Sequence, residues 1–273
     1  MSALEDVLKE NGAEYTIVAC DDNSSTQVSQ VENFISSECD LIMIHPSDAD
    51  AVEDAAMEAR EAGIKVMCWD DAMENADADW ILDNQALGIA IGEMAGEFIN
   101  EHYSADNPAH VLMIGYPSTA ILLERANCIE EGLERTAEGR YEIAAEAEGI
   151  EQTPVERQVA SLLSDGEHAD LKVVVGIGAG PMIGANQAYL DYYEDEIPED
   201  VGIFTADITR WQVNSITSGK EAARGVVGFE GTNEETAHAC AAMFVKILKG
   251  DVGARIVYRE ITPMTREYLS GIR

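Results

Sequence analysis

The sequence predicts an α/β protein with two domains, each a doubly wound parallel β-sheet covered by helices on both faces. Three observations lead to this prediction. Short apolar runs alternate with segments of helical periodicity along nearly the whole chain. Several of these runs stop at polar or charged residues, as strands do at the sheet edge where α/β proteins bind ligands. The length of 273 residues, with 46% hydrophobic residues, is sufficient for two hydrophobic cores.

The stretch from Lys65 to Asn84 shows the strand pattern twice. The apolar run 66–69 ends at Asp70 and Asp71, and the run 80–82 ends at an Asp-Asn pair. Because the carboxyl ends of parallel strands meet at one edge of a sheet, polar side chains should gather there. We therefore expect this stretch to form half of a ligand-binding cleft.

The first half of the chain is predicted to begin with a short helix that contains Leu4 and Leu8 and stops near Gly12. The strands expected in this half are residues 15–19, 41–44, 66–69 and 80–82. Helices are expected to start at the capping box Ser24-x-x-Gln27, at Ser47-x-x-Asp50 and after residue 84. The last of these helices should run to about residue 102. Its glycines Gly88, Gly92 and Gly96 recur every fourth residue, which favours close packing of the helix on a sheet.

The pattern restarts after the polar segment 103–108, which we interpret as a crossover between domains. Strands are expected at residues 111–114, 141–147, 171–175, 201–206 and 226–227, with a final extended piece at 255–261. Capping boxes at Thr153-x-x-Glu156 and Thr232-x-x-Glu235 predict the starts of two helices. The first domain should comprise residues 1–106 and 230–257, and the second domain residues 107–229 and 258–273.

The composition restricts the possible partners. The chain carries 52 acidic and 17 basic residues, a formal net charge of −35, whereas a nucleic-acid surface needs clustered Lys and Arg. The five cysteines are widely spaced and form no C-x-x-C pair, which predicts buried free thiols without disulfides or a metal site. No apolar run approaches the length of a transmembrane helix. We therefore expect no nucleic-acid partner, no metal and no cofactor.

Two acidic side chains are candidates for ligand contact because each ends a buried strand. Asp70 follows the run 66–69, and Asp207 follows the run 201–206. A carboxylate accepts hydrogen bonds from hydroxyl groups, so both residues suit a sugar or polyol. The alternative for Asp70 is a helix or loop cap, and the alternative for Asp207 is capping of the helix that follows it.

Arginine and tryptophan side chains are further candidates. Arg125 lies early in a predicted helix, where its planar fork suits hydroxyls or a carboxylate, although a surface arginine is the alternative. Trp69 and Trp211 have ring faces that pack on the C–H groups of a sugar, and core packing is the stronger alternative for Trp69.

Two other functions are tested and rejected on spacing. The G-I-G-A-G turn at 176–180 lacks the third glycine of a dinucleotide-binding fingerprint, because Pro181 occupies that position. We interpret the turn as a tight strand-to-helix connection that lines a cleft. Asp70 and Asp71 are adjacent on a strand, so their side chains point to opposite faces and do not flank one glycosidic bond.

The order of the motifs resembles the type I periplasmic solute-binding proteins of sugar ABC importers, in particular the ribose-binding-protein group. The motifs that carry the resemblance are I-M-I-H-P-S-D-A-D-A-V at 42–52, A-G-I-K-V-M-C-W-D at 62–70, and D-N-x-x-x-G-x-x-x-G at 83–92. E-R-A-N-C-I-E-E-G-L at 124–133, T-A-D at 205–207, and I-L-K-G-D followed by Y-R-E-I-T-P at 258–263 complete it. The resemblance covers nearly the whole chain.

The resemblance implies that Asp70, Arg125 and Asp207 grip the sugar. Three positions depart from the family pattern: Ile150 stands where ribose binders have an aromatic residue, Asp71 where many members have arginine, and Gly178 where many have asparagine. These departures argue against ribose as the ligand.

Members of this family begin with a strand, a loop with ligand contacts and a full first helix, whereas this chain starts within that helix. We therefore expect that the first strand of the amino-terminal domain and a signal peptide are absent from the chain. The expected consequences are an unpaired sheet edge, a weakened first domain and an incomplete site.

The predicted function is the capture of a neutral sugar or polyol between two hinged domains, outside the cytoplasmic membrane, and its delivery to an ABC permease. We expect a monomer that is not an enzyme, with possible lipid attachment at the cell surface. The alternative is the effector-binding domain of a lactose-repressor-type regulator, which shares the fold. A sugar-cleaving enzyme is a more distant alternative.

Overall fold

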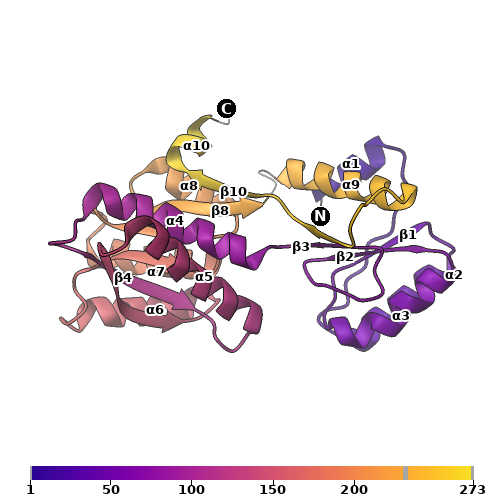
Figure 1. Cartoon of the computed structure of the whole chain (residues 1–273), viewed down its shortest axis with the longest axis horizontal. Coiled ribbons are helices and arrows are strands. Elements are labelled where there is room, and N and C mark those ends of the chain that lie inside the picture. Colours follow the sequence, from indigo (N-terminus) through magenta and orange to yellow (C-terminus); the bar gives the residue numbers. More distant parts are fainter. Residues whose placement is uncertain (1, 230–232, 272–273) are drawn as a thin grey trace. The chain divides into compact units, whose positions relative to one another are not determined.

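The computed structural model describes residues 2–229 and 233–271, and Figure 1 shows the chain coloured along its sequence. The chain divides into two compact units. The first unit comprises Met1–Asp83 and Glu230–Glu260, and the second comprises Asn84–Phe229 and Ile261–Arg273. The chain therefore passes from one unit to the other after Asp83, after Phe229 and after Glu260.

The sheet of the first unit has four parallel strands in the order β1-β2-β3-β9. The strands are β1 (Leu41–Ile44), β2 (Lys65–Trp69), β3 (Ala78–Ile81) and β9 (Ile256–Tyr258). Trp69 and Trp80 are register partners on β2 and β3. The outer strand β9 comes from the carboxyl-terminal part of the chain, so the last crossing returns through this sheet.

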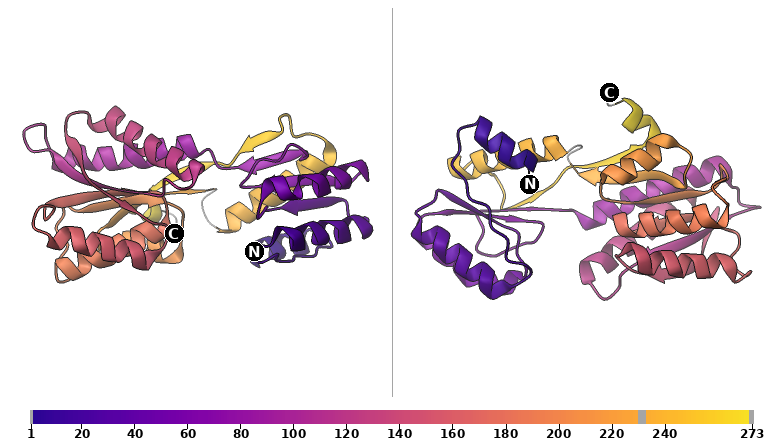
Figure 2. Two further views of the ribbon diagram at one scale, coloured as in Figure 1. Left: turned by 90° about the horizontal axis from the view of Figure 1, so that it is seen from below. Right: turned by 180° about the vertical axis from the view of Figure 1, so that it is seen from behind.

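Helices cover both faces of the first sheet (Figures 1 and 2). The helices are α1 (Ser2–Glu10), α2 (Ser24–Ser36), α3 (Ala49–Glu61) and α9 (Asn233–Lys249). Apolar residues of α2 and α3 pack with Ile42, Ile44 and Val66 on one face. Those of α1 and α9 pack with Met67 and Trp80 on the other face, and Figure 2 shows these two helices side by side. Alternating strand residues thus supply two separate cores.

The sheet of the second unit has six strands in the order β10-β8-β7-β6-β4-β5, of which only β10 is antiparallel to its neighbour. The strands are β4 (Ala109–Gly115), β5 (Tyr141–Glu148), β6 (Leu171–Gly176), β7 (Gly202–Ala206), β8 (Ala223–Phe229) and β10 (Ile261–Thr265). The five parallel strands end at one edge of this sheet. The predicted site residues of this unit lie after β4, β5, β6 and β7, either in the loops or in the helices that follow them.

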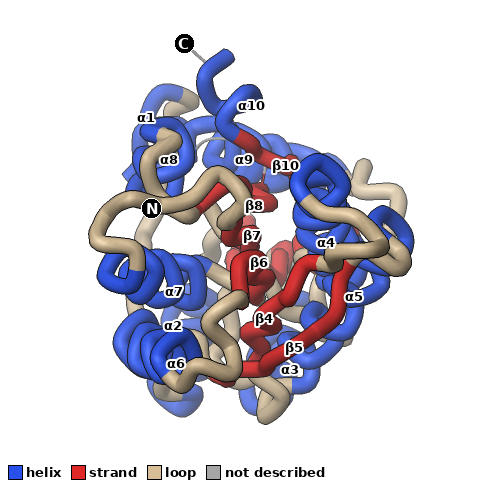
Figure 3. The backbone as a smooth tube through the Cα atoms, turned by 90° about the vertical axis from the view of Figure 1, so that its left-hand side faces the viewer, coloured by secondary structure: helices blue, strands red, loops and turns tan. Residues whose placement is uncertain are grey.

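The helices of the second unit again form two layers, which Figure 3 shows on either side of the strands. α4 (Asn84–His102) and α5 (Ala120–Ala137) pack on one face, together with Val111, Val173 and Phe204. The other face carries α6 (Gln152–Ser164), α7 (Ala179–Tyr192), α8 (Arg210–Ser218) and the short α10 (Arg266–Gly271). Both units are therefore α/β layers around parallel strands, as predicted. None of the described helices is long and apolar enough to cross a membrane.

The predicted strand at residues 15–19 is wrong. Residues 13–20 form no regular structure, and the side chains of Ile17 and Val18 are 44% and 47% exposed. A strand needs a neighbour to pair its backbone groups, and among the described residues β1 pairs with β2 alone. The β-branched composition of 15–19 favours a strand, but the composition is not sufficient without that partner.

The domain boundary predicted at residue 106 differs from the structure, which places α4 in the second unit. A Cβ atom on Gly92 would overlap the Ile129 carbonyl oxygen and lie 2.7 Å from the Leu133 nitrogen, so α4 and α5 are in backbone contact. The glycines of α4 therefore allow close packing on helix α5, and the prediction that they pack on a sheet is wrong. The last crossing also lies three residues later than the predicted boundary at 257, after Glu260.

Several predicted helix starts also differ. α2 is capped by Asn23, whose side chain accepts from Thr26 N at 2.8 Å, and α3 is capped by Asp48. α6 begins after Glu151, which makes no side-chain cap, so the box at Thr153 is absent. The predicted box at Thr232 lies outside the described residues. Cap motifs occur often in sequences, and a neighbouring Asn or Asp competes for the same role.

Candidate functional site

Three predicted residues lie at the carboxyl end of β2 in the first unit. Trp69 is the last strand residue, and Asp70 and Asp71 follow it. Asp70 has a left-handed backbone with φ of 65°, a conformation that Asp tolerates better than most residues, and its N–H donates to the Trp80 carbonyl at 3.1 Å. This backbone bond fixes the point where Asp70 leaves the sheet, whereas Asp71 is exposed.

The carboxylate of Asp70 is held by an arginine that the sequence analysis did not identify. Arg259 follows β9, is 8% exposed, and donates through Nη1 to Asp70 Oδ1 at 2.9 Å. Its guanidinium carbon lies 5.3 Å from the ring centroid of Trp69 and 5.0 Å from that of Trp80. The two indole rings meet edge to face at 5.3 Å. Trp69 is partly buried and packs against the core of its own unit.

The carboxyl end of β1 is organised by the buried side chain of Gln27. Its Nε2 donates to the His45 carbonyl at 2.8 Å, and its Oε1 accepts from Ser47 N at 2.9 Å. Both groups of the Gln27 amide are therefore bound to the H-P-S turn. This explains why Gln27 does not form the capping box predicted for α2. The turn after β1 is held in place beside the β2 terminus.

Asp207 directly follows β7 in the second unit and has a left-handed backbone, with φ of 72°. Its Oδ2 accepts from the Ala179 N–H at 2.9 Å, at the start of α7, where a carboxylate also meets the favourable end of the helix dipole. The alternative that Asp207 caps the following helix is wrong, because Thr209 and Gln212 form the capping box of α8. A Cβ atom on Gly178 would lie 2.9 Å from Asp207 Oδ2, so Gly178 leaves room at this carboxylate.

Arg125 is buried, with 8% exposure, and is not the surface arginine of the alternative. Its Nε and Nη2 donate to Asn84 Oδ1 at 2.9 and 2.6 Å, and its Nη1 donates to the Ile177 carbonyl at 2.6 Å. Arg125 on α5 thus ties the first residue of α4 to the loop after β6. These bonds orient the guanidinium at the strand ends of the second unit.

The two remaining predicted residues occupy different surroundings. Ile150 follows β5 and is 46% exposed, and its carbonyl group lies against Gly180 of α7 so closely that a Cβ atom there would overlap it. Trp211 is half-buried on α8 and packs against the core under α6 and α7. Ile150, Gly178 and Asp207 therefore gather around the amino end of α7, whereas Trp211 is largely a packing residue.

Sequence reasoning missed Arg259 and Asn84 as parts of these two arrangements. Asn84 has a weak signal, since it follows a strand in an Asp-Asn pair and begins a long helix. Arg259 has no local signal, because its partner Asp70 is 189 positions away. Only the pairing of β3 with β9 brings the two together.

The chemistry of the surrounding groups favours binding by hydrogen bonds. Cys68, next to Trp69, is fully buried, and burial together with Asp79 and Asp71 raises its pKa to about 12, so it remains a neutral thiol near pH 7. Among the described residues no cluster of His, Cys, Asp or Glu could hold a metal ion. The groups available at the strand ends are therefore carboxylates, guanidinium groups, amides and ring faces.

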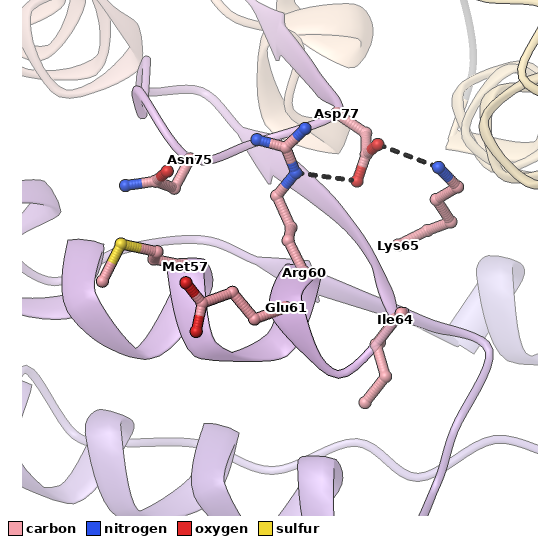
Figure 4. Close-up of a pocket in the computed structure, with 8 residues that line it drawn as sticks. Met57, Arg60, Glu61, Ile64, Lys65, Asn75 and Asp77 are labelled. Atoms are coloured by element: carbon pink, nitrogen blue, oxygen red, sulfur yellow. Dashed lines mark hydrogen bonds and ion pairs between the residues drawn. The ribbon is translucent and has the colours of Figure 1, made fainter.

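A cavity of about 340 Å³ lies at the opposite end of β2 in the first unit (Figure 4). Its wall includes Arg60 and Lys65, whose cationic groups both face Asp77, at 3.5 Å and 3.1 Å. Asp77 also accepts from the backbone of Val66 at 3.0 Å. These charges hold the loop before β3 against α3, and the cavity lies away from the strand ends that position Asp70.

Comparisons with known proteins define the class. The sequence matches the periplasmic binding protein domain family over residues 2–256. It is 33% identical over 113 residues to a D-xylose-binding periplasmic protein of Haemophilus influenzae, a match that covers 38% of this chain and 34% of that protein. It is 30% identical over 96 residues to a ribose import binding protein of Bacillus subtilis, covering 35% of this chain and 31% of that protein. The chain thus spans about a third of the length of these curated relatives.

The fold comparison extends over the whole chain. A crystal structure of a sugar-binding protein of a sugar ABC transporter from Bacillus halodurans superposes with a TM-score of 0.78, at 17% identity, covering 100% of this chain and 93% of that one. This likeness shows the type I periplasmic binding protein fold. The chain belongs to the periplasmic binding protein domain family. The matches do not favour the alternative of a transcription regulator.

Proposed function

We propose that the protein binds a neutral sugar or a related polyol and delivers it to an ABC importer outside the cytoplasmic membrane. The observation that carries this proposal is the pair of strand-end carboxylates, Asp70 and Asp207, one in each unit. Each has a left-handed backbone and one carboxylate oxygen already fixed by the protein. The second oxygen of each carboxylate then accepts a hydrogen bond from a sugar hydroxyl.

The relatives support the same ligand class, since they are described as D-xylose-binding and ribose import binding proteins. In the proposal the strand-end groups of each unit serve as ligand contacts. Arg125 donates to a ring or hydroxyl oxygen, Asp71 accepts from a peripheral hydroxyl, and Ile150 contacts the C–H face of the sugar. Gly178 provides space beside Asp207, while Trp69 and Trp211 shape the site mainly through packing.

The proposal includes no chemical step and no cofactor. A net charge of −35 disfavours nucleic acid, because phosphates would meet a strongly negative surface. We propose a monomer whose partners are the sugar and a permease. Its proposed location is the periplasm or the cell surface, with lipid attachment. Repulsion between the surface acids of different copies opposes self-association at high concentration.

Thermal melting with a panel of pentoses, hexoses and polyols tests this proposal. A ligand at a hundred times its dissociation constant stabilises a protein by about 2.7 kcal/mol, which is readily detected as a shift in Tm. We expect one sugar, or a few related ones, to raise Tm, and sugar acids of the same size to have no effect. A folded protein whose Tm no neutral sugar or polyol raises would contradict the proposal.

A second assay separates binding from cleavage. The protein is incubated with aryl glycosides of the sugar that raises Tm, and the released aglycone is measured. We expect no release above the rate in buffer, because the proposal gives Asp70 and Asp207 the role of hydrogen-bond acceptors and includes no catalytic pair. Turnover would contradict the proposal of a binding protein.

A further inference from the structure

The side chain of Arg259 is placed by the β-sheet of the first unit. Tyr258, the residue before it, is the register partner of Ile81 at the end of the β3–β9 ladder. The N–H of Arg259 then donates to the Ile81 carbonyl at 2.8 Å, which extends the ladder by one residue. Arg259 therefore leaves the sheet at a fixed point, two residues before the last crossing into the second unit.

The guanidinium of Arg259 lies against two aromatic rings. Trp69 and Trp80 contact it with ring centroids 5.3 and 5.0 Å from the guanidinium carbon, within the range of a cation–π interaction. The side chain is only 7% exposed. An arginine confined in this way holds its guanidinium in one orientation, because the planar fork has little room to rotate.

One donor of this guanidinium meets Asp70. Nη1 of Arg259 donates to Oδ1 at 2.9 Å, while the Asp70 side chain remains 34% exposed. Among the described residues none donates to Oδ2 of Asp70. The pair is therefore asymmetric: the guanidinium is buried, one carboxylate oxygen is bound to it, and the carboxylate belongs to a partly exposed side chain.

The backbone and the side chain of Asp70 are held by the same two strands. Its N–H is bound to Trp80 of β3, and its carboxylate is bound to Arg259 at the end of β9. A ligand that binds Oδ2 then meets a carboxylate whose orientation is already set, so little conformational entropy is lost on binding.

We propose that Arg259 is a positioning residue for the ligand, which holds Asp70 so that Oδ2 is presented to a sugar hydroxyl. This inference rests on the proposed function. The Arg259–Asp70 ion pair then contributes to the affinity for the sugar and not to the stability of the fold alone. This inference also identifies the residue beside the last crossing as a determinant of binding in the first unit.

A double-mutant cycle tests the inference with the sugar found in the melting panel. Dissociation constants are measured by titration calorimetry for wild type, Arg259→Met, Asp70→Asn and the double variant. We expect Arg259→Met to weaken binding about tenfold in the wild-type background and to have almost no further effect once Asp70 is Asn. Arg259→Lys keeps the charge without the fork, so we expect an intermediate affinity.

Two controls make the outcome decisive. Arg255→Met removes another arginine of the same unit, which pairs with Asp79 near the start of β9, and should leave the dissociation constant unchanged. Circular dichroism and Tm identify any variant that does not fold, in which case Arg259→Gln replaces Arg259→Met. The tryptophan emission of the Arg259 variants should also shift, because the guanidinium contacts two indole rings.

The outcomes separate this inference from the proposed function. Equal affinity of wild type and Arg259→Met, or the same loss in the Asp70→Asn background, would overturn the positioning role while sugar binding stands. Failure of the wild type to bind any sugar would overturn both.

Discussion

Asp70 and Asp207 share one backbone conformation at corresponding points of two different sheets. Each directly follows a parallel strand, and each has a left-handed backbone, with φ of 65° and 72°. The left-handed region strains most residues with a Cβ atom, and Asp and Asn are among the few that adopt it readily. Both carboxylates are therefore directed by a backbone geometry that few other side chains would allow.

This relationship predicts the effect of removing either charge. Asp70→Asn and Asp207→Asn keep a residue that tolerates the left-handed backbone, so we expect a Tm close to that of wild type. Each should weaken sugar binding by about 1.5–3 kcal/mol, the range for hydrogen bonds to charged groups. Titration calorimetry measures the affinity, and Asp70→Ala is the comparison that adds backbone strain. Unchanged affinity in both Asn variants would remove these carboxylates from the site.

The contact between α4 and α5 predicts a large difference between two glycine substitutions. In Gly92→Ala the new methyl group would overlap the backbone of Ile129 and Leu133, which lies on a neighbouring helix and has no room to retreat. We expect this variant to lose about 2–3 kcal/mol of stability, as overpacked sites do. Gly115→Ala is the control, because its Cβ would meet only Ala126 Cβ at an ordinary 3.6 Å. Urea unfolding gives both values, and equal midpoints would contradict the close packing.

The cysteines should differ in their reactivity in the native protein. Cys68 and Cys240 have no exposed surface, and burial raises the pKa of Cys68 to about 12, so it is neither accessible nor ionised near pH 7. Cys20 is partly exposed in the irregular segment 13–20. A disulfide reagent should therefore modify Cys20 in the folded chain and reach Cys68 only in urea. Peptide mapping identifies the sites, and modification of Cys68 as fast as Cys20 would contradict this arrangement.

The buried carboxylate of Asp79 predicts a pH dependence of stability. Burial raises its pKa above the ordinary 3.8, although Met73 N and Arg255 oppose the shift. The folded protein then holds a proton on Asp79 at pH values where the unfolded chain has released it, so this contribution to stability is lost as pH rises above 3.8. We expect the unfolding free energy of wild type, relative to that of Asp79→Asn, to fall as pH rises from 3.8 to the raised pKa of Asp79 in the folded protein. A difference that rises with pH would have the wrong sign.

The parallel strands could be predicted because each is a short apolar run that both helix layers bury. Leu171–Gly176 and Gly202–Ala206 are examples, and Asp207 marks the end of the second of them. The same reasoning placed Asp70 and Asp207 correctly at those ends. It failed for residues 15–19, where the composition favours a strand but no described neighbour pairs with it. Strand formation depends on a partner that the segment itself does not encode.

Contacts between distant segments were the other limit. The spacing of Gly88, Gly92 and Gly96 indicates close approach, but it does not say whether the neighbour is a sheet or α5. The Arg259–Asp70 pair joins residues 189 positions apart, and the sequence around either residue does not indicate its partner. Caps failed for a local reason, since Asn23 and Asp48 compete with the serines beside them.

Titration calorimetry of the chain with the neutral sugar that raises its Tm tests the central claim most directly. Wild type should give a saturable isotherm with one site per chain. The variant that carries both Asp70→Asn and Asp207→Asn, folded to the same Tm, should give none at the same concentrations. Full binding by that variant would show that the strand-end carboxylates do not form the site, and absence of heat from wild type would contradict the assignment of a sugar ligand.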